Sequence, residues 1–145
     1  MKNKGFTLVE LLAVIILLAV IALIATPIIL NVINDSRESA TMDSVSGIYH
    51  AIEIDYAERL EFSGNATYTY SNGGLVTTDA NGNNVNLPLS GALSRGAEAK
   101  GTVAGGNIKV AAWVGDKCYT KLDSKGSPQI NASGTDKATC LALAN

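Results

Sequence analysis

Glu10 is the most informative residue for chemistry in this sequence. It is the one charged residue in an apolar run from Phe6 to Leu30, and two lysines, Lys2 and Lys4, precede that run. A carboxylate near the apolar end of such a segment costs on the order of 2.5 kcal/mol or more in a membrane. Because a well-placed ion pair can offset the desolvation of both its members, we expect Glu10 to meet a positive charge.

Two cysteines, Cys118 and Cys140, are the second candidate for chemistry. In an exported domain a single pair favours a disulfide over a catalytic or metal role, because neither a C-x-x-C spacing nor a set of metal ligands surrounds it. The bond would close a loop over residues 118–140 and contribute roughly 3 kcal/mol in the chain-entropy description. We therefore predict a structural disulfide that pins the C-terminal tail to the domain.

The remaining sequence contains no recognisable catalytic motif. The chain has one histidine, His50, and neither a glycine-rich phosphate loop nor the turn that presents a nucleophilic serine. We therefore expect no catalytic residue, no metal site and no cofactor, with His50 on the surface of a helix. The net charge of -2 gives no electrostatic basis for direct nucleic-acid binding, and acidic residues interrupt the scattered lysines.

The run from Phe6 to Leu30 must position Glu10, and its length predicts a membrane-spanning helix. As a helix it would extend roughly 37 Å, which exceeds the hydrocarbon thickness of a bilayer. A cleaved signal peptide is disfavoured, because the run is too long and no small-residue cleavage site follows it. A simple signal anchor accounts for the two lysines on the cytoplasmic side, but it leaves Glu10 unexplained.

The string KGFTLVELL at Lys4–Leu12 resembles the processing site of type IV pilins and of the related pseudopilins. In that family a membrane peptidase cuts after the glycine and methylates the new amine. The resemblance implies that residues 1–5 are a removed leader, that the cut lies between Gly5 and Phe6, and that Phe6 is N-methylated. Glu10 matches the glutamate of the family, and we expect it to neutralise the Phe6 amine of a neighbouring copy as the helices bundle.

The apolar helix is expected to continue beyond the membrane as an amphipathic segment. Pro27 removes a backbone hydrogen bond and predicts a kink, and the resemblance implies a bent or locally extended helix in a filament. From residue 28 to about residue 60, apolar side chains recur at three- and four-residue spacing, as in Ile29, Val32, Ile33, Val45, Ile48, Ile52, Tyr56 and Leu60. This pattern predicts a helix that serves as the spine of the following domain.

Alternating side chains and turn residues predict strands after the helix. We expect an irregular loop over residues 88–106, turns at 71–74 and 79–84, and strands at residues 66–70, 75–78, 85–87, 108–114 and 117–122. A long N-terminal helix followed by a small antiparallel sheet is an α+β arrangement, and it agrees with the pilin fold. The predicted divisions are the leader 1–5, the transmembrane and filament-core helix 6–30, and the region 31–145 with the sheet and the disulfide loop.

The resemblance implies a structural protein, and we expect the main subunit of a type IV pilus that serves adhesion, motility or a related surface function. The implied partners are other copies of the chain, the prepilin peptidase, the pilus assembly platform with its ATPase, and the membrane before assembly. The implied location is the bacterial cytoplasmic membrane and then an extracellular filament. The alternatives are a pseudopilin of a type II secretion or DNA-uptake system, and a membrane-anchored surface domain that never polymerises.

Overall fold

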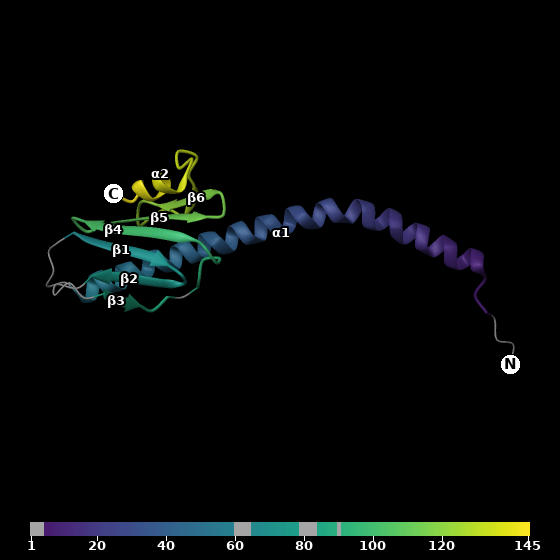
Figure 1. The fold of residues 1–145 in the computed structure, drawn as a ribbon, viewed down its shortest axis with the longest axis horizontal. Helices are drawn as coiled ribbons and strands as arrows, with labels where there is room; N and C mark the ends of the chain where they lie inside the picture. Colours follow the sequence, from purple (N-terminus) through teal and green to yellow (C-terminus); the bar gives the residue numbers. More distant parts are fainter. Residues whose placement is uncertain (1–4, 60–64, 79–83, 90) are drawn as a thin grey trace. The chain divides into compact units, whose positions relative to one another are not determined.

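The computed structural model describes residues 5–59, 65–78, 84–89 and 91–145. By its internal contacts the chain forms two compact units, residues 1–38 and 39–145. The helices and strands, all labelled in Figure 1 except β7, are α1 Leu8–Glu58, β1 Ala66–Ser71, β2 Gly74–Thr78, β3 Asn84–Leu87, β4 Glu98–Ala104, β5 Asn107–Val114, β6 Lys117–Lys121, β7 Gln129–Ile130 and α2 Lys137–Ala142. Helix α1 therefore begins in the first unit and ends in the second.

The strands form one antiparallel sheet with the order β3-β2-β1-β4-β5-β6-β7. The β1–β2 connection is a tight turn in which Asn72 and Gly73 have φ of 53° and 87°. Two successive positive φ values are typical of a type I′ hairpin turn, which Asn and Gly adopt most readily. The predicted turn at residues 71–74 is thus confirmed, whereas most of the turn predicted at 79–84 lies outside the described residues.

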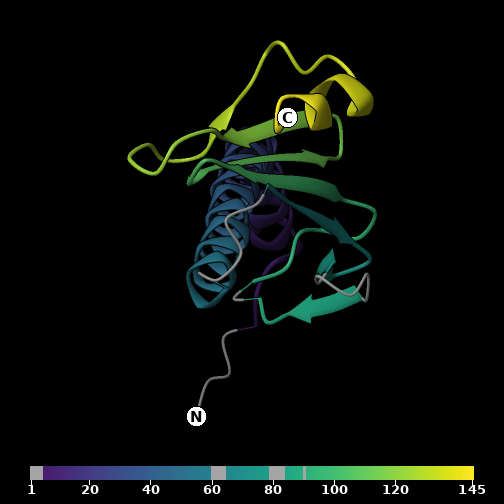
Figure 2. The ribbon, with the colours of Figure 1, turned by 90° about the vertical axis from the view of Figure 1, so that its left-hand side faces the viewer.

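In the second unit, helix α1 lies on one face of the sheet and α2 on the other (Figure 2). The main core lies between α1 and the sheet, where every second residue of β1, β4 and β5 faces the helix, as the period of a strand requires. Its fully buried members include Val45, Ile52, Tyr68, Tyr70, Leu75, Val103 and Val110. A smaller cluster under α2 contains Ala111, Cys118, Cys140 and Ala144, with Trp113 packed against it.

The predicted α+β arrangement, with a long N-terminal helix and an antiparallel sheet, is confirmed. So is the helical stripe within the second unit, because Val45, Ile48 and Ile52 are buried. The earlier members of that stripe are exposed, with Ile29 and Val32 at 55% and 61%. Leu60 lies outside the described residues.

The prediction of an irregular loop over residues 88–106 was wrong for its second half, where β4 runs between β1 and β5. Its sequence, EAKGTVA, has low strand propensity, and glycine in a strand usually weakens it. Pairing on both sides overrides that propensity, and the alternating burial of β4 follows the sheet rather than the local sequence. The short strand β7 and helix α2 were also not predicted.

Candidate functional site

The predicted cleavage point lies in an irregular segment just before helix α1. Gly5, Phe6 and Thr7 are exposed and have no regular secondary structure, and α1 begins at Leu8. The Phe6 side chain is 84% exposed, and no atom lies within 4 Å of a Cβ built at Gly5. The Gly5–Phe6 peptide bond is therefore sterically open to a peptidase, whereas Lys2 and Lys4 lie outside the described residues.

Glu10 and Thr7 form a capping box at the start of α1. The Glu10 Oε2 atom accepts hydrogen bonds from the Thr7 backbone N–H at 2.8 Å and from the Thr7 hydroxyl at 2.9 Å. In return, the Glu10 backbone N–H donates to Thr7 Oγ1 at 3.3 Å. This reciprocal arrangement satisfies backbone donors that a helix N-terminus leaves without partners.

This contact was not predicted from the sequence, although the T-x-x-E spacing of Thr7 and Glu10 is a signal for it. The structure thus adds a local structural role for Glu10 to the proposed role in assembly. Both side-chain contacts use Oε2, and no described residue donates a hydrogen bond to Oε1. Glu10 can therefore hold the first turn of its own helix and still present one oxygen to a cation from outside.

The surface of α1 that follows Glu10 is apolar around the whole helix. The side chains from Leu8 to Leu30 are almost all exposed in the single chain, with Leu8 at 81% and Leu23 at 79%. By length and composition this is a helix that could cross a membrane, and its apolar part lies near the N-terminus. An apolar surface of this extent indicates contact with lipid or with other apolar helices.

Pro27 lies inside α1, and the helix continues through it without a break. The preceding residue, Thr26, donates a 2.7 Å hydrogen bond from its hydroxyl to the carbonyl oxygen of Ala22, one turn earlier. Threonine hydroxyls that bond back to the preceding turn often accompany bends in helices. The kink and the local melting of the helix in a filament remain predictions.

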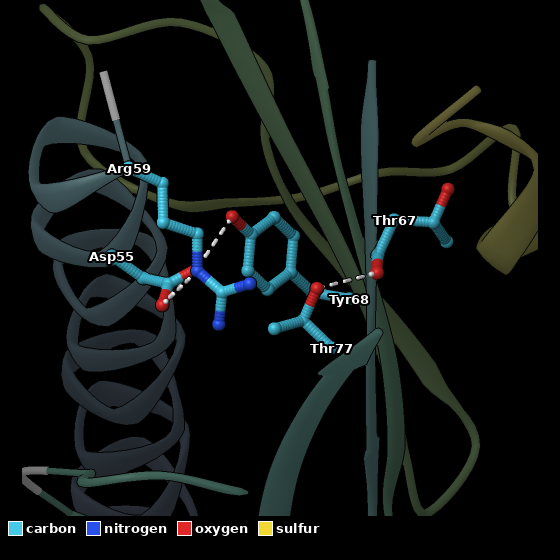
Figure 3. Close-up of polar contacts among 5 residues, drawn as sticks. All are labelled: Asp55, Arg59, Thr67, Tyr68 and Thr77. Carbon is cyan, nitrogen blue, oxygen red and sulfur yellow. Dashed lines mark hydrogen bonds and ion pairs between the residues drawn. The ribbon is translucent and has the colours of Figure 1, made fainter. Parts of the chain in front are cut away.

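Asp55 joins the end of α1 to strand β1 in the second unit (Figure 3). Its Oδ1 atom pairs with Arg59 Nε at 2.8 Å, and its Oδ2 atom accepts a 2.9 Å hydrogen bond from the Tyr68 hydroxyl. Burial, together with the hydrogen bond to this carboxylate, raises the pKa of Tyr68 well above its usual range. The buried Asp55 therefore has partners for both oxygens, as a carboxylate in a protein interior requires.

Cys118 on β6 and Cys140 on α2 form a disulfide. Helix α2 is positioned by Asp136, whose carboxylate accepts a 2.9 Å hydrogen bond from the Thr139 backbone N–H as an N-cap. That backbone hydrogen bond lowers the pKa of Asp136. The cap therefore places Cys140, one residue further on, over the sheet and against β6.

The loop that the disulfide closes is also tied to helix α1. Lys121, which is buried at the end of β6, has its ammonium group 4.7 Å from the centre of the Tyr49 ring. The same ammonium donates a hydrogen bond to the Gly126 carbonyl. Because this contact combines a cation–π interaction with a hydrogen bond, it fixes the first half of the loop beside α1.

His50 is exposed on α1, where its Nδ1 lies 3.1 Å from Glu53 Oε2. Among the described residues, no three His, Cys, Asp or Glu side chains are grouped as metal ligands. The described part of the chain thus brings together residues for helix capping, helix–sheet packing and a disulfide. The exposed segment of residues 5–7 and the apolar surface of α1 are the features that point to function.

One comparison with known proteins identifies the N-terminus. Residues 1–26 match the family model described as the prokaryotic N-terminal methylation motif. The match covers the predicted cleavage point and Glu10, and it shows that the chain carries the leader found in type IV pilins and pseudopilins. Comparison with curated proteins and with solved structures found no significant match.

Proposed function

From the N-terminal methylation motif, which marks a type IV pilin-like or pseudopilin precursor, we propose that this chain is the main subunit of a type IV pilus. Residues 1–5 are removed by a prepilin peptidase, and Phe6 becomes the methylated first residue. The observation that carries the proposal is the motif itself, which includes Glu10 and most of the apolar part of helix α1. The function is structural, and the proposal assigns no catalytic residue to the chain.

Removal of the leader leaves the apolar helix in place, so the subunit stays in the cytoplasmic membrane until it is needed. The cut also creates a positive charge at Phe6, two positions along the chain from Leu8, where α1 begins. No described residue donates a hydrogen bond to Glu10 Oε1, and this atom accepts one from the Phe6 amine of a neighbouring copy. The apolar faces then supply adhesion, and the ion pair sets the axial register because an unpaired charge in an apolar bundle is costly.

The partners of this process are other copies of the chain, the peptidase, and the assembly platform with its ATPase. The second unit becomes the surface of the filament, with the disulfide-bounded loop on it. That loop is the observation that favours a pilus subunit over a pseudopilin of a secretion or DNA-uptake system. Adhesion or motility is the resulting surface function.

The first test is the mass and sequence of the N-terminal peptide of protein taken from its native cell surface. A peptide that begins at methylated Phe6 supports the proposal. A peptide that still begins at Met1 contradicts it and leaves a membrane-anchored domain.

The second test is the Glu10→Leu variant, which should be inserted and cleaved but should yield few filaments. Asp35→Leu is a matched control, because Asp35 is an exposed acid of α1 outside the apolar run. Wild-type filament yield from Glu10→Leu would contradict the assembly role of Glu10. Equal loss of yield from both variants would show a general effect of removing an acid from α1.

A further inference from the structure

Arg95 lies beside a shallow cleft that the proposed function does not use. Its side chain is exposed, and it makes no ion pair with any described residue. The cleft has a volume of about 450 Å³ and is lined by Asn72, Gly73, Leu93, Ser94, Arg95, Gly96 and Ala97. Leu93 and Ala97 are buried and form apolar walls, whereas the other lining residues are exposed.

The composition of this cleft suits a carboxylate on a short aliphatic chain. A guanidinium group recognises a carboxylate with two parallel hydrogen bonds, and such bonds are stronger than those between neutral groups. The side chain of Leu93 provides apolar contact, and its backbone N–H is already bonded to the Tyr70 hydroxyl at 3.0 Å. The charge at Arg95 is therefore the part of the cleft that selects a ligand.

The cleft lies at one end of the sheet, and the end of helix α1 lies at the other. The β1–β2 turn and the start of β4 meet at the Arg95 end, where Ser71 pairs with Glu98. Ser44, on the stretch of α1 in the second unit, reaches the same end, since its hydroxyl contacts the Ala92 carbonyl at 3.4 Å. Helix α1 then runs along the sheet to its end at Glu58, a further 14 residues or about 21 Å.

Glu58 is available for an external partner at the second end. It is exposed and has no ion pair with a described residue, whereas its neighbour Arg59 is paired with Asp55. Arg95 at one end and Glu58 at the other thus carry opposite charges, and neither has an ion pair with a described residue of the same chain. A contact between such ends is heterologous, and a heterologous contact that does not close into a ring generates a helical filament.

An acid from the Arg95 end itself would give a different assembly. Asp43 and Asp116 lie toward that end, because Asp43 adjoins Ser44 and Asp116 follows Trp113, which pairs with Glu98. Two copies joined through Arg95 and one of these acids would use the same patch twice. Such an isologous contact closes as a dimer and cannot extend a filament.

We propose that the Arg95 cleft of one copy binds the Glu58 carboxylate of a second copy, so that the second units (residues 39–145) of the two copies join end to end. This inference rests on the proposed function, because only polymerised copies bring the two ends together repeatedly. This ion pair gives the second units a specific contact with each other, in addition to the apolar contact between the helices.

Cross-linking of intact filaments tests the contact with the full chain. Cysteines are introduced as Arg95→Cys and Glu58→Cys, and a short bis-maleimide joins them, because an Arg–Glu pair separates its backbones more than a disulfide allows. We expect a ladder of covalent oligomers after denaturation. The matched control pairs Arg95→Cys with Glu53→Cys, another exposed acid on α1. A ladder no stronger than that of this control, in filaments of normal yield, would overturn the proposal.

Charge reversal provides a second test that does not depend on new cysteines. Arg95→Glu or Glu58→Arg alone should lower the yield of sheared filaments by about tenfold or more, because like charges then face each other. The double variant Arg95→Glu with Glu58→Arg should restore the yield. Two single variants with wild-type yield, or a double variant no better than the singles, would overturn the contact. If the wild type itself makes no filaments, the proposed function fails instead.

Discussion

Gly101 on β4 and Ile52 on α1 occupy a point of close approach between the helix and the sheet. A Cβ built at Gly101 would overlap the Cδ1 atom of Ile52, which is completely buried. Gly101 pairs with Tyr68 on β1 and with Val110 on β5, so it lies in the middle of the sheet. The absence of a side chain at this position therefore makes room for the helix rather than for an unusual backbone conformation.

We predict that Gly101→Ala destabilises the second unit by about 1–3 kcal/mol, because the added methyl group overpacks the core. Ile52→Val removes Cδ1 and should cost about 0.5–1.5 kcal/mol alone. The double variant should lose less stability than the sum of the losses in the two single variants, because removal of Cδ1 makes room for the added methyl group. Urea unfolding of the full chain in detergent measures all three. Gly74→Ala is the control, since no atom lies closer than 4.0 Å to its Cβ position, and strictly additive effects would contradict the steric explanation.

Gly101 also shows why part of the fold could not be predicted from the sequence. In the local sequence, a glycine such as Gly101 indicates a break in a strand. It lies within a strand because β4 pairs with β1 on one side and with β5 on the other. Strands with alternating apolar residues, such as β5, were predicted to within one residue at each end. Helix α1 was predicted because its apolar pattern is long, whereas α2 has six residues and is held by a cap and a disulfide.

The candidate site likewise contains some features that could be predicted from the sequence and others that could not. The cleavage point and Glu10 could be identified because the motif is contiguous in the sequence. The Asp55–Tyr68 hydrogen bond and the Arg95 cleft each join segments that are distant in the sequence. No local pattern indicates such contacts, so they required the folded structure.

Tyr68→Phe should destabilise the second unit by about 1–3 kcal/mol, because the buried Asp55 carboxylate loses a hydrogen-bond donor. Tyr70→Phe is the matched control, since the Tyr70 hydroxyl accepts from a neutral backbone N–H of Leu93. Thermal unfolding at neutral pH compares the two variants. A loss for Tyr68→Phe no larger than that for Tyr70→Phe would show that the charged partner adds nothing.

The same tyrosine should make stability fall at alkaline pH. The pKa of Tyr68 is raised in the folded state by burial and by Asp55, so folding favours the protonated hydroxyl. Its contribution is fully present below about pH 10, where an unfolded tyrosine is still protonated, and is lost as the pH rises toward the folded pKa. Burial also raises the pKa of Tyr49, so the wild type should lose stability through both residues. Tyr68→Phe should therefore show a shallower decline in urea unfolding between pH 9 and 11, and an unchanged slope would contradict this assignment.

Thr7→Ala should loosen the first turn of α1 without removing Glu10. The substitution eliminates the hydroxyl that donates to Glu10 Oε2 and accepts from the Glu10 backbone N–H. Loss of an N-cap costs about 1 kcal/mol, which corresponds to roughly fivefold faster local opening. Hydrogen exchange of the amides at residues 8–11 in detergent measures this opening. Thr26→Ala serves as the control, because the Thr26 hydroxyl bonds within the helix, and exchange unchanged by Thr7→Ala would contradict the capping role.

Gly134 should be required for efficient formation of the disulfide. A Cβ at this position would lie 2.5 Å from Sγ and 2.6 Å from Cβ of Cys118, and 3.1 Å from Cβ of Cys140. The φ of Gly134 is not positive, so the restriction comes from crowding at the two cysteines and not from the backbone conformation. Gly134→Ala should therefore raise the fraction of free thiols in exported protein, as measured by alkylation and mass spectrometry. Its unfolding free energy should fall by up to about 3 kcal/mol, the contribution of a disulfide that closes a loop of this size. Gly74→Ala should leave both quantities unchanged, and a fully oxidised, equally stable Gly134→Ala protein would show that the loop can move away from the cysteines.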